Sequence, residues 1–261
     1  MAGVLASMKI LTSMKFAMLR HSAAGLRQVG WVIGGLLVLA TWAATWFAAS
    51  AEVRAEVVML LTILWAVGAA IGPVLMSGAG VLRVDYFTLL PLDRSRLALA
   101  LVGSTFPGVA AGYVLLAVGA VVLHAVLLAP LAVPVAVVGA ALGWVVLITL
   151  SRLVYAALGS AMRTWLGVEI AGIQFGAMIA AMLVGWMIVT RGVQTVPELI
   201  AGGLGDDRTA AALAAFPSSW AVLAVDAAAG GRWAAALGWL LALLVLAAAL
   251  LGLAARVLRP N

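Results

Sequence analysis

The sequence lacks cysteine and contains little charge. None of the 261 residues is Cys, which excludes disulfides and thiolate metal sites. Charged residues make up 9% of the chain and hydrophobic residues 66%. Uncharged stretches of about 18 or more residues recur along the chain, and such stretches are long enough to cross a bilayer. The composition therefore predicts an integral membrane protein without a sizeable domain outside the membrane.

The sequence also lacks the motifs of enzymes that act alone. Its only lysines are Lys9 and Lys15, and no G-x-x-x-x-G-K-[ST] motif is present, so the phosphate-binding loop of a nucleotide hydrolase cannot form. His21 and His124 are too few for a histidine metal cluster. The motifs H-E-x-x-H and G-x-S-x-G are absent as well. We therefore expect no catalytic residue, no metal site and no directly bound cofactor.

Ionisable residues are scarce inside the apolar stretches, whereas ion-coupled transporters usually place such residues there. His124 is the main exception, and a lone histidine is most often hydrogen-bonded to a neighbouring helix. Arg152 and Glu169 lie at the ends of two apolar stretches, where their side chains are expected to reach the membrane interface. Ion-driven transport therefore has little support in the sequence.

Hydrophobic periodicity predicts an all-α integral membrane protein with six transmembrane helices. The spans cover about 28–51, 57–77, 97–128, 133–153, 170–190 and 233–255, within a transmembrane domain of residues 28–261. Pro130 and Pro134 mark a tight turn between the third and fourth spans. A cleavable signal peptide is the alternative for the first span, but its apolar run exceeds the usual length of such a region.

Segment 1–27 is predicted to form an N-terminal interfacial amphipathic helix, because several polar residues share one helical face. These are Lys9, Ser13, Arg20 and Arg27. A solvated basic tail is the alternative. With this segment in the cytoplasm, all cations except Arg54, Arg191, Arg208 and Arg232 lie on the cytoplasmic side, as the positive-inside rule expects. We therefore expect a multi-pass plasma membrane protein with both termini cytoplasmic, whose net charge of +6 does not indicate a nucleic-acid partner.

The longest cytoplasmic loop, 80–96, mixes bulky apolar residues with charges of both signs. Residues 84–90 can form a short helix that exposes Phe87 and Leu90, and Pro91 ends it. A short apolar helix held in the cytoplasm can fill a groove on a partner protein. A connector that lies on the membrane surface explains the same residues equally well.

The long outer segment 191–232 contains an uncharged run, 209–225, that a proline interrupts. The run is marginal for a membrane crossing, so a pair of short re-entrant or interfacial helices fits it better. A plain extracellular loop is the alternative. The residues at the centre of this possible re-entrant segment are Phe216, Pro217, Ser218, Ser219 and Trp220.

Two short motifs resemble a known family. Leu89-Leu90-Pro91-Leu92-Asp93-Arg94-Ser95-Arg96 leads into the third span, and Phe216-Pro217-Ser218-Ser219 precedes the last one. In these motifs and in its six-span layout, the chain resembles the transmembrane permease subunits of type-2 ABC exporters.

The resemblance implies that loop 80–96 carries a coupling helix that docks on a separate ABC ATPase subunit. The implied contact residues are Asp85, Tyr86, Phe87, Leu89, Leu90, Pro91, Asp93 and Arg94. ATP and Mg²⁺ would bind the ATPase, and a second permease half would complete a homodimer or heterodimer. The cargo expected from the weakly charged spans is hydrophobic or amphipathic. The alternatives are a small secondary transporter, a membrane scaffold without an ATPase, or a lipid-modifying enzyme, for which the acidic residues are too scattered.

Overall fold

A computed structural model describes residues 13, 24–75, 100–161, 167–205 and 207–258, and for parts of α2, α3 and α8 it describes the backbone alone. These residues form helices and connecting turns, and no strand occurs among them. The helices are α2 (Ala24–Phe47), α3 (Ala51–Leu75), α5 (Val109–Val118), α6 (Ala120–Leu128), η2 (Pro130–Ala132), α7 (Val133–Ala161), α8 (Gly167–Gly202), α9 (Asp207–Ala215), η3 (Pro217–Ser219), α10 (Trp220–Ala229) and α11 (Trp233–Val257).

Five helical segments are long and apolar enough to cross a membrane, which supports the predicted multi-pass membrane protein. They are Gly30–Phe47, Ala51–Gly72, Val109–Leu128, Pro130–Ala161 and Trp233–Val257. The predicted span 170–190 lies within α8, many of whose side chains are outside the description, so the count of six stays a prediction. The predicted interfacial helix 1–27 lies almost entirely outside the described residues.

The second span begins earlier than predicted because helix α3 includes the charged residues that precede the apolar run. Ser50 stands before the helix, and its Oγ accepts a hydrogen bond from the N–H of Val53 at 3.2 Å, which caps the helix. Glu52 in the first turn is favourable beside the positive end of the helix dipole. Helix α3 therefore starts at Ala51, whereas the sequence predicted a start near residue 57.

The third span is shorter and less regular than predicted. Its continuous helix starts at Val109, after a turn that contains Pro107, whose ring cannot continue a helix from the preceding residues. At Gly119 the span is divided into α5 and α6. The indole N–H of Trp42 donates to the carbonyl oxygen of Leu116 at 2.8 Å, and an uninterrupted helix would use that carbonyl for the N–H of Ala120. Trp42 also packs close to Gly119, where a β-carbon would lie 3.1 Å from its ring.

The predicted turn between the third and fourth spans is confirmed. Pro130 begins the short helix η2, and Pro134 lies in the first turn of α7, where a missing N–H costs no intrahelical hydrogen bond. The two spans therefore form a tight helical hairpin. Helix α7 then continues to Ala161, beyond the predicted end at residue 153.

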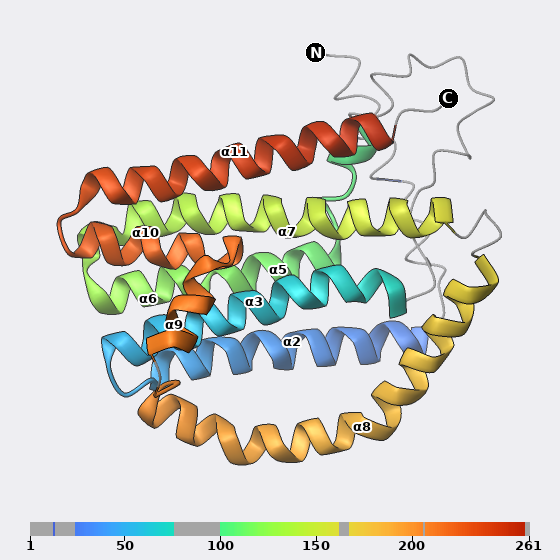
Figure 1. The fold of residues 1–261 in the computed structure, drawn as a ribbon, viewed down its shortest axis with the longest axis horizontal. Helices are drawn as coiled ribbons and strands as arrows, with labels where there is room; N and C mark the ends of the chain where they lie inside the picture. Colours follow the sequence, from blue (N-terminus) through green and yellow to red (C-terminus); the bar gives the residue numbers. More distant parts are fainter. Residues whose placement is uncertain (1–12, 14–23, 76–99, 162–166, 206, 259–261) are drawn as a thin grey trace.

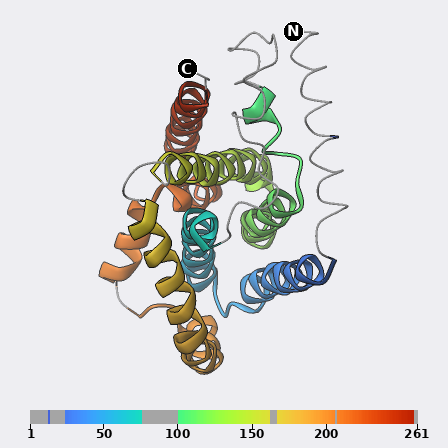
Figure 2. The ribbon, with the colours of Figure 1, turned by 90° about the vertical axis from the view of Figure 1, so that its right-hand side faces the viewer.

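The long helices run side by side along the long axis of the molecule, and α8 bows along one edge (Figure 1). Helix α3 lies in the middle of the bundle, in contact with α2, α6, α7 and α8 (Figure 2). Connections 48–50, 129–132 and 230–232 all lie at the left of Figure 1, and we call this end of the bundle the hairpin end.

Small side chains allow α10 to pack inside the bundle against α6, α7 and α11. Six of its residues are buried, namely Ala221, Val222, Ala224, Val225, Ala227 and Ala228. They form a hydrophobic core with residues such as Ala125 and Leu243. Gly139 of α7 faces α10 so closely that a β-carbon there would lie 3.1 Å from the β-carbon of Ala221. Close approach of this kind depends on residues without bulk, as in other membrane helix pairs.

Large apolar side chains are exposed on the outside of the bundle. Leu39 and Phe47 of α2 are 66% and 70% exposed, and Leu237 and Val245 of α11 are similarly open. A soluble protein rarely exposes apolar surface over whole helices, whereas a lipid-facing surface requires it. The exposed faces of α2 and α11 therefore agree with a position in the bilayer.

Replacement of Gly139 by Ala should destabilise the bundle relative to replacement of Gly143 by Ala. Both changes raise the helix propensity of α7 equally, but only the methyl group at position 139 meets α10, and the space at position 143 is open. We expect Gly139→Ala to be less stable than Gly143→Ala by about 1 kcal/mol or more. Thermal unfolding in detergent, followed by size-exclusion chromatography, measures the difference. Equal stability of the two variants would contradict the tight contact with α10.

Candidate functional site

The predicted coupling residues lie outside the described part of the chain. Asp85, Tyr86, Phe87, Leu89, Leu90, Pro91, Asp93 and Arg94 all fall within residues 76–99. The flanking described segments are the end of α3 and a helical turn that includes Ala100, and both lie at the end of the bundle opposite the hairpin end (Figure 1). The role of these residues in coupling therefore stays a prediction.

The possible re-entrant segment forms two short helices joined by a sharp bend. Residues 208–215 and 217–229 meet at 91°, between Phe216 in an extended conformation and Pro217 at the start of η3. From this bend, α10 runs back toward the hairpin end, where α11 begins (Figure 1). The pair therefore enters and leaves the bundle at the same end. Its position in a membrane stays a prediction.

The bend at residues 216–219 contains buried polar groups. The hydroxyl oxygens of Ser218 and Ser219 are inaccessible to solvent, and neither has a hydrogen-bond partner among the described residues. Ser218 lines a small cavity together with Thr62, Gly143 and Leu147, and the cavity has room for roughly one water molecule. Trp220 packs against Trp239 of α11, with 6.0 Å between the ring centroids. The bend is thus anchored by an aromatic contact next to a small cavity whose lining is mainly apolar.

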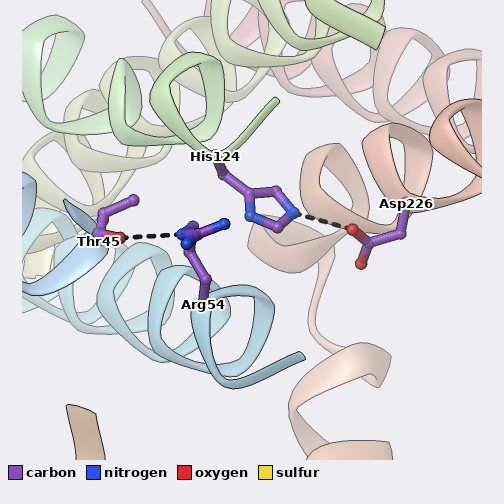
Figure 3. A network of polar contacts seen from close by, with 4 residues as sticks. All are labelled: Thr45, Arg54, His124 and Asp226. Atoms are coloured by element: carbon purple, nitrogen blue, oxygen red, sulfur yellow. Dashed lines mark hydrogen bonds and ion pairs between the residues drawn. The ribbon is translucent and has the colours of Figure 1, made fainter. Parts of the chain in front are cut away.

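A polar pair joins α6 to α10 near the hairpin end. The imidazole Nε2 of His124 lies 2.9 Å from a carboxylate oxygen of Asp226 (Figure 3). His124 is fully buried, whereas the side chain of Asp226 is 31% exposed. The prediction that His124 bonds to a neighbouring helix is therefore confirmed. The other ring nitrogen, Nδ1, is buried and has no hydrogen-bond partner among the described residues.

Arg54 lies on the opposite side of the imidazole ring. Its Nε–H donates to the carbonyl oxygen of Thr45 on α2 at 3.2 Å. Figure 3 shows its guanidinium group turned toward the ring of His124. A neutral histidine with its proton on Nε2 fits both neighbours, because Nε2–H donates to the carboxylate and the lone pair of Nδ1 faces the cation. We call these four residues, Thr45, Arg54, His124 and Asp226, the polar network; they belong to α2, α3, α6 and α10.

A second set of contacts ties the end of α8 to the start of α3. The carboxylate of Glu56 accepts a hydrogen bond from the backbone N–H of Leu204 at 2.8 Å. The N–H of Ala49 donates to the carbonyl oxygen of Ile200 at 3.0 Å. Gly203 has a φ of +68°, and a β-carbon there would lie 2.5 Å from the Glu56 carboxylate, so only glycine fits. The end of α8 is therefore fixed to the start of α3.

Arg152 departs from the sequence prediction. Its side chain was expected to reach the membrane interface, but Arg152 is only 9% exposed, and α7 continues for nine residues beyond it. The protein itself therefore encloses this arginine near one end of α7. Glu169, at the start of α8, is exposed as expected.

Comparisons of the chain with protein-family models, curated proteins and solved structures found no match. Among the described residues, no group of three His, Asp or Glu side chains is placed to hold a metal ion. Fold and site together define a class, the multi-pass helical membrane proteins. In this chain a buried histidine is bonded to a partly exposed aspartate beside an arginine.

Sequence reasoning identified His124 but not its partners. Asp226 was assigned to an outer loop, yet it is the one acidic residue in a run that otherwise consists of small apolar residues. An isolated acid in such a run is costly to bury and usually has a polar partner, and that signal was present in the sequence. The sequence could not predict that Arg54 lies beside His124, because this proximity depends on how the helices pack.

Replacing Asp226 by Ala should destabilise the bundle, because it leaves the buried Nε2–H of His124 without an acceptor. We expect a loss of about 1–3 kcal/mol, against little change for Glu198→Ala at an exposed position of α8. The double variant with His124→Ala should lose less than the sum of the single losses. Thermal unfolding of all four variants in detergent measures the cycle. Additive losses would mean that the two side chains do not interact.

Proposed function

We propose that this chain is the membrane permease subunit of an ATP-binding-cassette exporter, which moves a hydrophobic or amphipathic cargo outward. The observation that carries the proposal is the sharply bent pair α9 and α10 directly before the last long helix. This is the arrangement that the resemblance to type-2 ABC permeases implies for the end of the chain. The long apolar helices and the exposed apolar faces of α2 and α11 agree with it.

In this proposal the chain supplies the path and a partner supplies the energy. The sequence has no nucleotide-binding motif, so ATP and Mg²⁺ would bind a separate ATPase subunit. Loop 80–96 would contact that ATPase, with Phe87 and Leu90 as apolar anchors and Asp93 and Arg94 as charges at the edge. A second permease half, identical or different, would complete the transport path. The chain would therefore be no enzyme by itself.

The double replacement Phe87→Ala and Leu90→Ala should uncouple the chain from its ATPase, because it removes both predicted apolar anchors. We expect co-purification of the partner ABC ATPase subunit to fall about tenfold or more. Phe47→Ala is the matched control, because Phe47 is 70% exposed on α2 and is not one of the predicted coupling residues. Co-expression, affinity purification and quantitative mass spectrometry measure the ratio of the subunits. Undiminished binding by a correctly inserted double variant would disprove the coupling assignment.

A small secondary transporter is the second candidate, and the polar network is the observation that favours it. Ionisable residues buried within membrane helices often carry protons in ion-coupled transport. His124 is fully buried, and its partner Asp226 is partly exposed, so a proton could reach the pair from one side.

The two candidates differ in their source of energy. Vesicles that contain the chain alone can be given a pH gradient without ATP, and uptake of a fluorescent amphipathic dye can be followed. If the chain is an ATP-driven permease, we expect no uptake beyond that of empty vesicles. Uptake that depends on the gradient, and that His124→Gln abolishes, would identify a proton-coupled transporter and reject the ATP-driven proposal.

A further inference from the structure

We propose that His124 is a proton-binding site whose protonation releases α3 from α6 at the hairpin end, while α6 and α10 stay together. The inference does not depend on an ATPase partner, so it holds for either candidate function. It rests on three observations: the burial of His124, an Nδ1 atom without a hydrogen-bond partner among the described residues, and the position of Arg54.

The neutral histidine connects the two sides of the polar network. Its Nε2–H donates to Asp226 of α10, and its Nδ1 presents a lone pair toward the guanidinium group of Arg54 on α3. Arg54 is itself held by the carbonyl of Thr45 on α2. The charges of Arg54 and Asp226 balance across a neutral ring. In this state one hydrogen bond joins α6 to α10 and another joins α3 to α2, and the guanidinium group of Arg54 faces the imidazole ring between the two pairs.

Protonation has opposite effects on the two sides of this arrangement. The bond from Nε2–H to the carboxylate of Asp226 becomes charge-assisted and therefore stronger. At Nδ1 the lone pair is replaced by an N–H donor, which then faces another donor of the same charge on Arg54. Like charges and facing donors repel at short range, most strongly where water is excluded. Arg54, and α3 with it, should therefore move away from α6.

Among the described side chains of the helices that pack against α6, no other charged group has the role assigned here to Arg54 or Asp226. Helices α2, α3, α5, α7 and α10, together with η2, pack against α6. Within the described side chains of α2, α5, α7 and η2, the ionisable groups are Tyr113, whose hydroxyl donates to the carbonyl of Trp31, and Arg152 and Tyr155, which lie toward the opposite end of α7. On α3, Glu56 is engaged by Leu204, and Glu52 is exposed.

The absence of native cysteine makes this movement directly measurable. Ala55 is buried on α3, in the core it shares with Val121 and Ala125 of α6, whereas Ala51 is exposed one turn earlier on the same helix. We would introduce Ala55→Cys and, separately, Ala51→Cys into the full chain in dodecyl maltoside. Both would be labelled with a charged methanethiosulfonate from about pH 8 to about pH 5, across the usual titration range of an imidazole.

The labelling rate at position 55 is divided by the rate at position 51, which cancels the effect of pH on thiol reactivity. We expect this ratio to rise about tenfold on acidification, within the usual range of coupling between two sites. Arg54→Gln removes the opposing cation and should abolish the rise, whereas Arg54→Lys keeps the charge and should retain it. His124→Gln cannot take up the proton and should stay at the low ratio.

Three results would overturn the proposal. The first is a ratio that does not change with pH in the parent chain. The second is the same rise in the folded His124→Gln variant, which would assign the proton to another group. The third is an undiminished rise in Arg54→Gln, which would show that repulsion by this cation is not the cause. Size-exclusion chromatography checks that each variant is folded, and the comparison of Gln with Lys at position 54 decides the matter if His124→Gln does not fold.

Discussion

The structure depends on the burial of a helix that is too short to cross a membrane. Helix α10 has ten residues, and yet most of its surface lies in the core. Its neighbours can approach closely because the contacts consist of alanine, valine and glycine, with Gly139 directly opposite Ala221. One end of α10 lies near a small cavity with buried serine hydroxyls, and toward the other end Asp226 is bonded to His124. Both ends of the short helix therefore have polar groups inside the protein rather than in lipid.

The same demand for internal partners explains the irregular third span. Trp42 donates to the carbonyl of Leu116 three residues before the helix is divided at Gly119, and Tyr113 donates to the carbonyl of Trp31. Indole and phenol groups of this kind link α2 to α5 through hydrogen bonds to the backbone. Helix α2 exposes much of its apolar surface, so these bonds supply a specific contact where the hydrophobic effect alone does not favour one partner over lipid.

Much of the helical layout could be predicted from apolar run lengths, and the hairpin at Pro130 and Pro134 from proline chemistry. The predicted helix boundaries were wrong where local polar contacts, rather than hydropathy, decide where a helix begins or is interrupted. Ser50 starts α3 before the apolar run begins, and Trp42 divides a stretch that is uniformly apolar. At the site, the bend at Pro217 was visible in the sequence, and the bonding of His124 was expected. Asp226 and Arg54 were assigned to loops, because charge alone does not reveal which helices pack together.

The bond between α6 and α10 also has a consequence for the order in which the chain assembles. Asp226 is synthesised about a hundred residues after His124, and α10 alone is too short and carries an uncompensated acid. It cannot partition into lipid as an independent segment. In the proposed membrane arrangement we therefore expect α6 and α7 to be in place before α10 packs, so that the earlier helices act as the receptor for the later one.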